Sequence, residues 1–452
     1  MVQLIKNQYH KFQAFLANLK YSFPARGMKV IGVTGTDGKT TTVSMIYHVL
    51  KYAGVNAGMI STIEVKLGEK SLDSGLHVTT PDPWDLPRYL SMMKKEGITH
   101  VVLESTSNGL DQNRLAYVGF NSAVITNIRE DHLDYHKTWE NYAKAKFKLI
   151  ELVKKDGLVV LNDDDEKAAS WILQRSQNLK RNIFAKWFSK SEFMNKKMTI
   201  EGLEFDYEQM HFKVPMIGEH NFENIGQVIN ICKRYTELET IQKALLSFQA
   251  PLGRMQLMQS RPFSVIVDFA HTPNALEHAL QSVDQLRETD DARIITVFGC
   301  AGQRDKGRRR MGEVSAKMAD ITVLTAEDPR DEDLGLVNNE ILKYASGAKA
   351  VLIDRFANRK LFKAAPFENI AQKIEVVLKN RDKPFFTFDE NTPRSREDAI
   401  EFALRIARPQ DIVFITGKGH ERSLAFGKPI KEYPWSDQDI VKEKLQELAV
   451  EA

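Results

Sequence analysis

The sequence predicts an α/β protein with two mostly parallel sheets. Eight apolar segments alternate with helical stretches, and this alternation is typical of parallel strands covered by helices. In chain order the segments read VIGVTG, THVVLEST, SAVITNI, GLVVLND, SVIVDFA, RIITVFG, DITVLTA and DIVFITG. The chain of 452 residues is also too long for a single core. We therefore expect at least two domains.

A fresh series of strands marks the predicted domain boundary. It begins near Pro251 and Gly253, directly after a helical stretch at 241–248. We expect an N-terminal extension, a central domain and a C-terminal domain, over residues 1–28, 29–250 and 251–452 respectively.

The N-terminal extension is basic and amphipathic. No acidic residue precedes Asp37, and the apolar residues Phe12, Phe15, Leu16 and Leu19 recur at helical spacing. We expect this apolar stripe to pack on the first domain. The alternative is a helix that contacts a membrane surface or a protein partner.

The overall composition is that of an ordinary globular protein. The net charge of +3 is too small to indicate nucleic-acid binding, so a basic surface should be local. Two cysteines, Cys232 and Cys300, exclude a disulfide framework and fit a reducing compartment. No apolar run approaches the roughly 20 residues that span a bilayer. We expect a cytoplasmic protein without a transmembrane segment.

A phosphate-binding loop follows the first strand of the central domain. Its residues are Gly35, Thr36, Asp37, Gly38, Lys39, Thr40 and Thr41. The glycines let backbone N–H groups approach phosphate oxygens, the lysine supplies a positive charge, and a threonine hydroxyl can bind Mg²⁺. The spacing departs from the general P-loop, because Val33 stands where that motif has a glycine. The segment predicts binding of a nucleoside triphosphate with Mg²⁺.

Two further strand ends carry polar groups. Glu104 ends the strand at 99–103, where a carboxylate beside a P-loop is placed to hold Mg²⁺. The segment TNIREDHLDYH follows the next strand and supplies oxygen and nitrogen groups from Asn127, Asp131, His132, Asp134 and His136. This density suits a second cation and a polyphosphate. Lys146 lies in the lysine-rich stretch YAKAKFKL, which taken alone reads as a solvated helix face.

Many ordered motifs together resemble the Mur ligase family, and within it the MurE type. They are TGTDGKTTT, TTPDP, ESTSNGLDQNRL, TNIREDHLDYH, YAKAK, GEHNFEN, GRM, VDFAHTPNAL, VFGCAGQRDKGRRRMG, EDPRDED and TGKGHE. The likeness covers about residues 28–440. It implies a central P-loop ATPase-like domain and a C-terminal Rossmann-like domain. It also implies an ATP-dependent ligase that phosphorylates an acceptor carboxylate and lets an amine attack the acyl phosphate, in peptidoglycan precursor synthesis.

The resemblance also implies roles for particular residues. Lys39, Thr40, Glu104 and His132 would bind the γ-phosphate and metal ions, and Lys146 matches a lysine that the family carbamylates. The nucleotide would further contact Asn127, Asn224, Arg254, Asp268 and His271. The muramoyl-peptide acceptor would contact Thr79, Thr80, Thr106, Gln112 and Arg114. The amino-acid pocket would contain Arg304, Asp328, Pro329, Arg330, Gly417 and Glu421.

The Glu-Asp-Pro-Arg motif bears on the added amino acid. Arg330 favours a substrate with a second carboxylate, because a guanidinium forks onto carboxylates. Asp328 replaces the asparagine of the diaminopimelate-type motif and so adds a negative charge there. Our hypothesis is meso-diaminopimelate as the added amino acid.

Three alternatives remain at this point. Only about 27 residues precede the first strand, whereas MurE-type proteins carry a UDP-binding domain there, so the acceptor could be held differently or by a partner. A ligase of the same chemistry could act on another carrier, as a γ-glutamyl-chain extender does. A nucleotide-binding scaffold without catalysis is the third alternative. The retention of Lys39, Glu104, His132, Lys146 and the Arg330/Glu421 pair argues against it.

Overall fold

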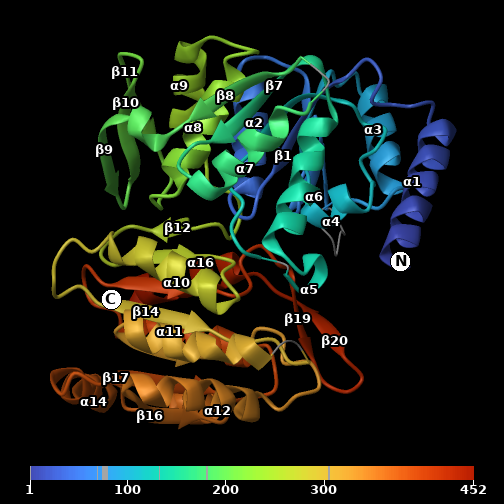
Figure 1. Ribbon diagram of the computed structural model, residues 1–452. Helices are drawn as coiled ribbons and strands as arrows, with labels where there is room; N and C mark the ends of the chain where they lie inside the picture. The colour runs from blue at the N-terminus through green and yellow to red at the C-terminus, as the bar shows by residue number, and fades with distance from the viewer. Residues whose placement is uncertain are drawn as a thin grey trace. The chain divides into compact units, whose positions relative to one another are not determined.

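The computed structural model shows two compact α/β units (Figure 1). It describes residues 2–68, 70–73, 80–131, 133–179, 182–303 and 306–451. The first unit contains Met1–Lys197, Leu203–Pro215 and His220–Pro251, and the second contains Met198–Gly202, Met216–Glu219 and Leu252–Ala452. The short segments Met198–Gly202 and Met216–Glu219 therefore belong to the second unit, although we predicted that they lie within the central domain.

An eight-stranded sheet forms the centre of the first unit, in the order β4-β3-β2-β5-β1-β6-β7-β8. The strands are β1 (Lys29–Thr34), β2 (Ala57–Ile60), β3 (Glu64–Leu67), β4 (Lys70–Asp73), β5 (His100–Glu104), β6 (Phe120–Ile125), β7 (Val153–Asn162) and β8 (Phe184–Phe188). The strands from β2 to β8 in this order run parallel, and β3 and β4 pair antiparallel. The central strand β1 is buried at five of its six positions, as expected for a parallel strand covered on both faces.

Helices cover this sheet, and a small antiparallel sheet follows it in the chain. The helices are α1 (Val2–Lys20), α2 (Lys39–Tyr52), α3 (Asp85–Lys95), α4 (Ser107–Asp111), α5 (Leu133–His136), α6 (Trp139–Glu151), α7 (Glu166–Ser176), α8 (Asn221–Cys232) and α9 (Leu238–Leu246). The small sheet contains β9 (Met194–Thr199), β10 (Gly202–Tyr207) and β11 (Met210–Val214). Side chains cap several of these helices; Thr106, Thr138 and Asp165 each accept a hydrogen bond from the third residue beyond.

A seven-stranded sheet forms the second unit, in the order β12-β13-β18-β14-β15-β17-β16. The strands are β12 (Gln256–Gln259), β13 (Ser264–Val267), β14 (Ile294–Phe298), β15 (Ile321–Leu324), β16 (Ala350–Phe356), β17 (Lys383–Phe388) and β18 (Ile412–Ile415), with a separate hairpin of β19 (Ser423–Phe426) and β20 (Lys431–Pro434). Its helices are α10 (Pro273–Asp284), α11 (Met311–Met318), α12 (Leu334–Ala345), α13 (Arg359–Lys363), α14 (Phe367–Lys379), α15 (Arg394–Ile406) and α16 (Asp437–Glu451). Only β12 pairs antiparallel in this sheet.

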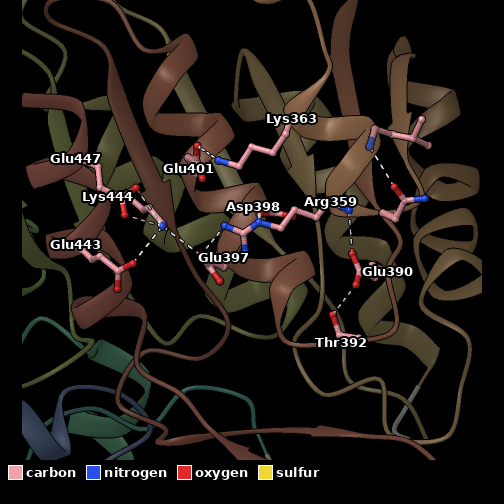
Figure 2. A network of polar contacts seen from close by, with 12 residues as sticks. Arg359, Lys363, Glu390, Thr392, Glu397, Asp398, Glu401, Glu443, Lys444 and Glu447 are labelled. Carbon is pink, nitrogen blue, oxygen red and sulfur yellow. Dashed lines mark hydrogen bonds and ion pairs between the residues drawn. The ribbon is translucent and has the colours of Figure 1, made fainter. Parts of the chain in front are cut away.

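An ion-pair network joins three helices of the second unit (Figure 2). Three carboxylates of α15, those of Glu397, Asp398 and Glu401, face cations of α13 and α16. Lys444 of α16 and Arg359 of α13 both reach Glu397 Oε1, at 3.1 and 3.2 Å. The network therefore fixes α15, whose N-terminal part lies close to the amino-acid loops described below.

The predicted fold class is confirmed. All eight apolar segments form strands, namely β1, β5, β6, β7, β13, β14, β15 and β18. Strands at or next to sheet edges, such as β3, β9 and β16, were not predicted, because their buried and exposed positions follow no continuous apolar run. No helix within the described ranges is long and apolar enough to cross a membrane.

The expected packing of the N-terminal stripe is wrong. Phe12 and Leu19 of α1 are 58% and 56% exposed, Leu16 is also exposed, and of the stripe only Phe15 has a ring contact within the described residues, with Tyr117 and Phe23. The opposite face of α1 packs instead, through the buried residues Ala14, Ala17 and Asn18. Small side chains let the helix approach the unit closely and leave its large apolar side chains outside.

Candidate active site

The phosphate-binding loop links β1 to α2. Gly38 is the N-cap of α2 and has φ +78°, in the left-handed region that glycine favours. A Cβ at this position would lie 2.3 Å from Asn224 Oδ1, so the loop backbone runs directly against α8. The first N–H groups of α2 have no partner within the helix, and they can bind an anion. Lys39 donates its Nζ to the carbonyl of Thr36 at 2.7 Å, on the same loop.

The end of β6 holds this loop in shape. The amide of Asp37 donates to Asn127 Oδ1 at 2.9 Å, and the amide of Thr36 donates to the Asn127 carbonyl at 2.9 Å. Thr126 donates its hydroxyl to the Asp37 carbonyl at 2.6 Å. The sequence predicted Asn127 as a nucleotide contact. In the structure it supports the loop backbone.

A hydroxyl and a carboxylate meet beside the loop. Thr40 Oγ1 lies 3.0 and 3.1 Å from the two carboxylate oxygens of Glu104. Glu104 is 1% exposed and also accepts the amide of Thr62 at 2.9 Å. Glu104 is therefore a buried, hydrogen-bonded carboxylate and not a solvated acid at the end of a strand. Hard oxygen ligands of this kind are those that Mg²⁺ prefers.

Lys146 is buried against the same loop. Its Nζ donates to the carbonyl of Gly35 at 2.6 Å and lies 4.3 Å from the centre of the Tyr142 ring. Burial, and then the charge of Lys39, hold the pKa of Lys146 well below its usual value. The interpretation of YAKAKFKL as a solvated lysine face is thus wrong at this position, although Lys144 on the same helix is exposed.

Four predicted acceptor residues come together at the start of α4. The hydroxyls of Thr80 and Thr106 lie 2.9 Å apart, and the Thr106 amide donates to Thr80 Oγ1 at 2.9 Å. Arg114 donates to the Thr80 carbonyl at 3.0 Å and to Gln112 Oε1 at 2.8 Å. The sequence separates these residues by up to 34 positions, and the segments before α3, after β5 and after α4 bring them together.

Three predicted site residues, Thr79, His132 and Arg304, lie outside the described residues. Within those the structure describes, no group of three or more histidine, cysteine or acidic side chains could hold a metal.

In the second unit, the loops after β15 and β18 meet. Lys418 is 1% exposed, donates to Asp328 Oδ1 at 3.0 Å and pairs with Glu421. Asp328 Oδ1 also accepts the Ala425 amide at 2.9 Å. The charge that Asp328 adds to the motif is therefore offset by a buried lysine, and its carboxylate accepts a backbone amide of β19.

Arg330 presents its guanidinium from a fixed backbone. Its amide donates to the Ala425 carbonyl at 2.9 Å, and its carbonyl accepts the Gly427 amide at 2.6 Å. One guanidinium nitrogen, Nη1, donates to the Gly302 carbonyl at 2.8 Å. The other two nitrogens have no partner within the described part of the chain. They can still bind a carboxylate.

Glu327, between β15 and Asp328, is a residue that the sequence did not single out. It is 5% exposed, and its Oε2 has no hydrogen-bond partner within the described ranges. Burial raises the pKa of Glu327 to about 7, although Lys418 and Arg308 act in the opposite direction. Gly417 lies against it, since a Cβ there would be 3.6 Å from Glu327 Cγ. The sequence signal that could have identified Glu327 is its position in the Glu-Asp-Pro-Arg motif.

Arg254 and two histidines surround Phe269. The guanidinium carbon of Arg254 lies 4.9 Å from the Phe269 ring centre, and the rings of His271 and His420 lie 4.5 and 4.6 Å from it. Burial, and then Arg254 among nearby cations, lowers the pKa of His420 to about 3. Burial also lowers the pKa of His271 to about 4. Neutral histidines among arginine and lysine side chains suit an anionic ligand.

Asp268 has its carboxylate occupied by backbone. Its two oxygens accept the amides of Met255 and Ala270, both at 2.8 Å. The sequence predicted Asp268 as a nucleotide contact. In the structure its carboxylate holds the backbone of the segment that carries Arg254.

The segments 33–232 and 253–379 match the Mur ligase middle domain and the Mur ligase glutamate ligase domain. A UDP-N-acetylmuramoyl-L-alanyl-D-glutamate–2,6-diaminopimelate ligase of Chlamydia felis is 31% identical to this chain, over 98% of the chain and 84% of the relative. A UDP-N-acetylmuramyl-tripeptide synthetase of Borreliella afzelii is also 31% identical, over 98% and 81%. The chain belongs to the Mur ligase family. It is an ATP-dependent ligase that forms amide bonds.

Solved structures share the fold of this Mur ligase. A UDP-N-acetylmuramoyl-L-alanyl-D-glutamate–2,6-diaminopimelate ligase superposes with a TM-score of 0.65 at 24% identity, over 97% of this chain and 83% of that one. The MurF ligase of Thermotoga maritima, solved in complex with ADP, superposes with a TM-score of 0.61 at 15% identity, over 96% and 85%. At these identities the likeness concerns the fold alone.

The nucleotide loop of this Mur ligase fits a nucleotide with Mg²⁺. The loop is lined by backbone at Gly38, and the hydroxyl of Thr40 and the carboxylate of Glu104 form a pair of oxygen ligands. A polar cavity of about 280 Å³ opens beside Asn127 and is also lined by Asn162 and Glu223. Its amides and carboxylates suit hydrogen bonding to a base better than binding of phosphate. The sequence did not predict this cavity.

Proposed function

We propose that this Mur ligase joins meso-diaminopimelate to UDP-N-acetylmuramoyl-L-alanyl-D-glutamate in peptidoglycan precursor synthesis. The names of several relatives support the substrate pair, since those from Chlamydia felis, Cytophaga hutchinsonii and Aquifex aeolicus are all diaminopimelate ligases at 31–32% identity. A cytoplasmic location stays a prediction.

The observation that carries the proposal is the geometry of Arg330. Its backbone is held on both sides by β19, and two guanidinium nitrogens remain available. A guanidinium binds a carboxylate through two parallel hydrogen bonds. Lysine carries only an ammonium group at the end of its side chain, so it has no second carboxylate to accept these bonds. Asp328 does not weaken this inference, because Lys418 pairs with its charge.

Glu421 and Glu327 complete the proposed amino-acid pocket. Diaminopimelate carries two ammonium and two carboxylate groups, so its pocket needs both signs of charge. Arg330 supplies a cation, and the carboxylates of Glu421 and Glu327 supply acceptors for ammonium groups. Gly417 leaves room beside Glu327.

In the first unit, the proposed reaction begins at the acceptor carboxylate. Thr80, Thr106 and Arg114 would hold the muramoyl-peptide, and the α2 N-terminus with Lys39 would hold the ATP phosphates. Mg²⁺, bound by Thr40 and Glu104, would neutralise phosphate charge. The carboxylate takes the γ-phosphoryl group, ADP leaves, the amine then attacks the acyl phosphate, and inorganic phosphate leaves as the amide forms.

We include carbamylation of Lys146 in the proposal. A neutral buried amine is the form that reacts with carbon dioxide, giving an N–C bond, a carboxylate and one released proton. The contact of Lys146 with the Gly35 carbonyl would place that carboxylate next to the phosphate loop. Supply of ¹³C-bicarbonate to the purified protein should give a carbamate carbon resonance that is absent from the Lys146→Arg variant. An unchanged spectrum in both proteins would remove this part.

Phosphate release tests the substrate assignment. The assay contains ATP, Mg²⁺, UDP-N-acetylmuramoyl-L-Ala-D-Glu and either diaminopimelate or lysine. We expect release with diaminopimelate and little with lysine. Arg330→Ala should raise the KM for diaminopimelate about 30-fold or more, because a charge-assisted bidentate contact contributes about 2 kcal/mol or more.

Arg381→Ala is the matched control. Arg330 and Arg381 both have positive φ, of 57° and 60°, so alanine meets the same backbone strain at either position. Arg381 is exposed and lies outside the pocket. If lysine alone supports release, or if both variants raise the KM equally, the diaminopimelate assignment is wrong. If protein that binds ATP releases no phosphate with either amino acid, the acceptor is a different molecule.

A further inference from the structure

The outer face of α1 is an exposed apolar surface. It contains Tyr9, Phe12, Leu16 and Leu19, which recur at spacings of three and four residues and so lie on one side of the helix. Each of them is exposed, Tyr9 at 59% and Phe12 at 58%. Figure 1 shows α1 on the outside of the first unit, next to α3.

The inner face of α1 anchors the helix to the unit. Ala14 and Ala17 are fully buried, and Asn7 donates its side-chain amide to Asp111 Oδ2 at 3.0 Å. The ring of Phe15 lies 5.7 Å from that of Tyr117. The helix is therefore held in one orientation, with Tyr9, Phe12, Leu16 and Leu19 exposed.

Positive charge flanks the outer face. Lys6, Lys11 and Lys20 are exposed, and none of them makes an ion pair with a carboxylate in the described part of the chain. The sequence contains no acidic residue before Asp37. The exposed Trp84 extends the surface at the C-terminal end of α1, where its ring lies 5.9 Å from Lys20 Nζ.

We propose that α1 docks this Mur ligase on a membrane surface that carries anionic lipid headgroups. Aromatic and leucine side chains on one face with lysines beside them are the composition of helices that lie in the bilayer interface. The lysines would contact headgroups, and the apolar side chains would enter the boundary of the acyl chains.

A second copy of the chain fits this face less well. A two-fold axis pairs a surface with itself, so the lysines of two α1 helices would face one another without an acidic partner. An anionic surface instead complements every charge on the helix.

Vesicle co-sedimentation of the full chain tests the proposal. We expect sedimentation with vesicles of phosphatidylcholine and phosphatidylglycerol, and not with phosphatidylcholine alone. Added salt should weaken binding, because the screening length falls from about 10 Å at 0.1 M to about 3 Å at 1 M. The triple variant Lys6→Gln/Lys11→Gln/Lys20→Gln should bind at least about tenfold more weakly, since each lysine near an anionic surface contributes about fivefold.

Two double variants separate the apolar contribution from a general effect. Phe12→Glu/Leu16→Glu should lower vesicle partitioning at least about tenfold. The matched control Leu173→Glu/Leu246→Glu changes leucines that are 56% and 58% exposed on α7 and α9, and it should bind like the wild type. Phosphate release should be unchanged in both variants, because no altered residue belongs to the proposed active site. Thermal unfolding should also be unchanged, because the altered side chains are exposed.

Three outcomes would overturn the proposal. The first is wild-type protein that stays in the supernatant with both vesicle types. The second is binding that Phe12→Glu/Leu16→Glu leaves unchanged. The third is a wild-type dimer that this variant converts to a monomer while neither protein binds vesicles, which would assign the face to a second copy. None of these outcomes affects the amino-acid assignment, which depends on Arg330.

Discussion

The substitution Gly38→Ala tests whether ATP binding depends on the close approach of the phosphate loop to α8. Gly38 has φ +78°, and an added Cβ would lie 2.3 Å from Asn224 Oδ1, about 1 Å short of ordinary van der Waals contact. Asn224 is 3% exposed and donates to Asn221 Oδ1 at 2.9 Å, so it cannot simply rotate away. Either the loop or α8 must move.

Gly54→Ala separates the clash from backbone strain. Gly54 follows the other end of α2, has φ +76°, and a Cβ there would meet nothing within 4 Å. Both variants carry the left-handed penalty of about 1 kcal/mol. Only Gly38→Ala also disturbs a buried amide, at a further cost of about 1–3 kcal/mol.

The two variants should therefore differ in stability and in nucleotide binding. With about 1 kcal/mol changing the Tm of a unit of this size by about 2–4 °C, Gly54→Ala should lower the Tm by that amount and Gly38→Ala by about twice as much or more. Gly38→Ala should weaken ATP binding at least about tenfold, and Gly54→Ala less than about twofold, as measured by ATP titration. Equal ATP affinity of the two variants would refute the reasoning that the loop depends on this contact.

Three further predictions concern buried charges. Burial raises the pKa of Glu327 from 4.5 to about 7, so the protein loses up to about 3 kcal/mol of stability as the pH rises from 4.5 to 7. The Glu327→Gln variant does not have this loss. Its Tm should equal that of the wild type near pH 4.5 and exceed it most above pH 7. Arg396 is 0% exposed, pairs with Asp437 and donates to the carbonyls of Ala326 and Thr416. Arg396→Lys should therefore lower the free energy of chemical unfolding by about 3–5 kcal/mol and raise the KM for the amino acid more than the KM for ATP. The control Arg405→Lys should lower the free energy of unfolding by less than about 1 kcal/mol. Glu104→Gln should raise the Mg²⁺ concentration needed for half-maximal phosphate release at least about tenfold with the Tm nearly unchanged, and an unchanged Mg²⁺ requirement would remove Glu104 from the metal site.

Periodic apolar patterns determined the fold class from sequence. Buried strands such as β1, β14 and β18 are apolar at nearly every position, since helices cover both faces of a parallel sheet. Exposed strands such as β9 and β20 lack that pattern, and only pairing with neighbours defines them.

The sequence also determined which residue types could serve an ATP-dependent ligase, because the loop from Gly35 to Thr41 and the motif at 327–330 have specific chemistry. It could not show which atoms are already engaged. Asn127 and Asp268 use their side chains on backbone amides, and Asp328 is paired with Lys418. Such partners come from distant parts of the chain.

Burial was decided by the tertiary structure alone. Lys144 and Lys146 stand two residues apart on one helix, yet the first is exposed and the second is 1% exposed beneath the phosphate loop. On α1 the alanines Ala14 and Ala17 are buried whereas Tyr9 and Phe12 are exposed, against the order that hydrophobicity by itself predicts. A helix can present either face to its neighbours, and on α1 the small side chains of Ala14 and Ala17 are those that are fully buried.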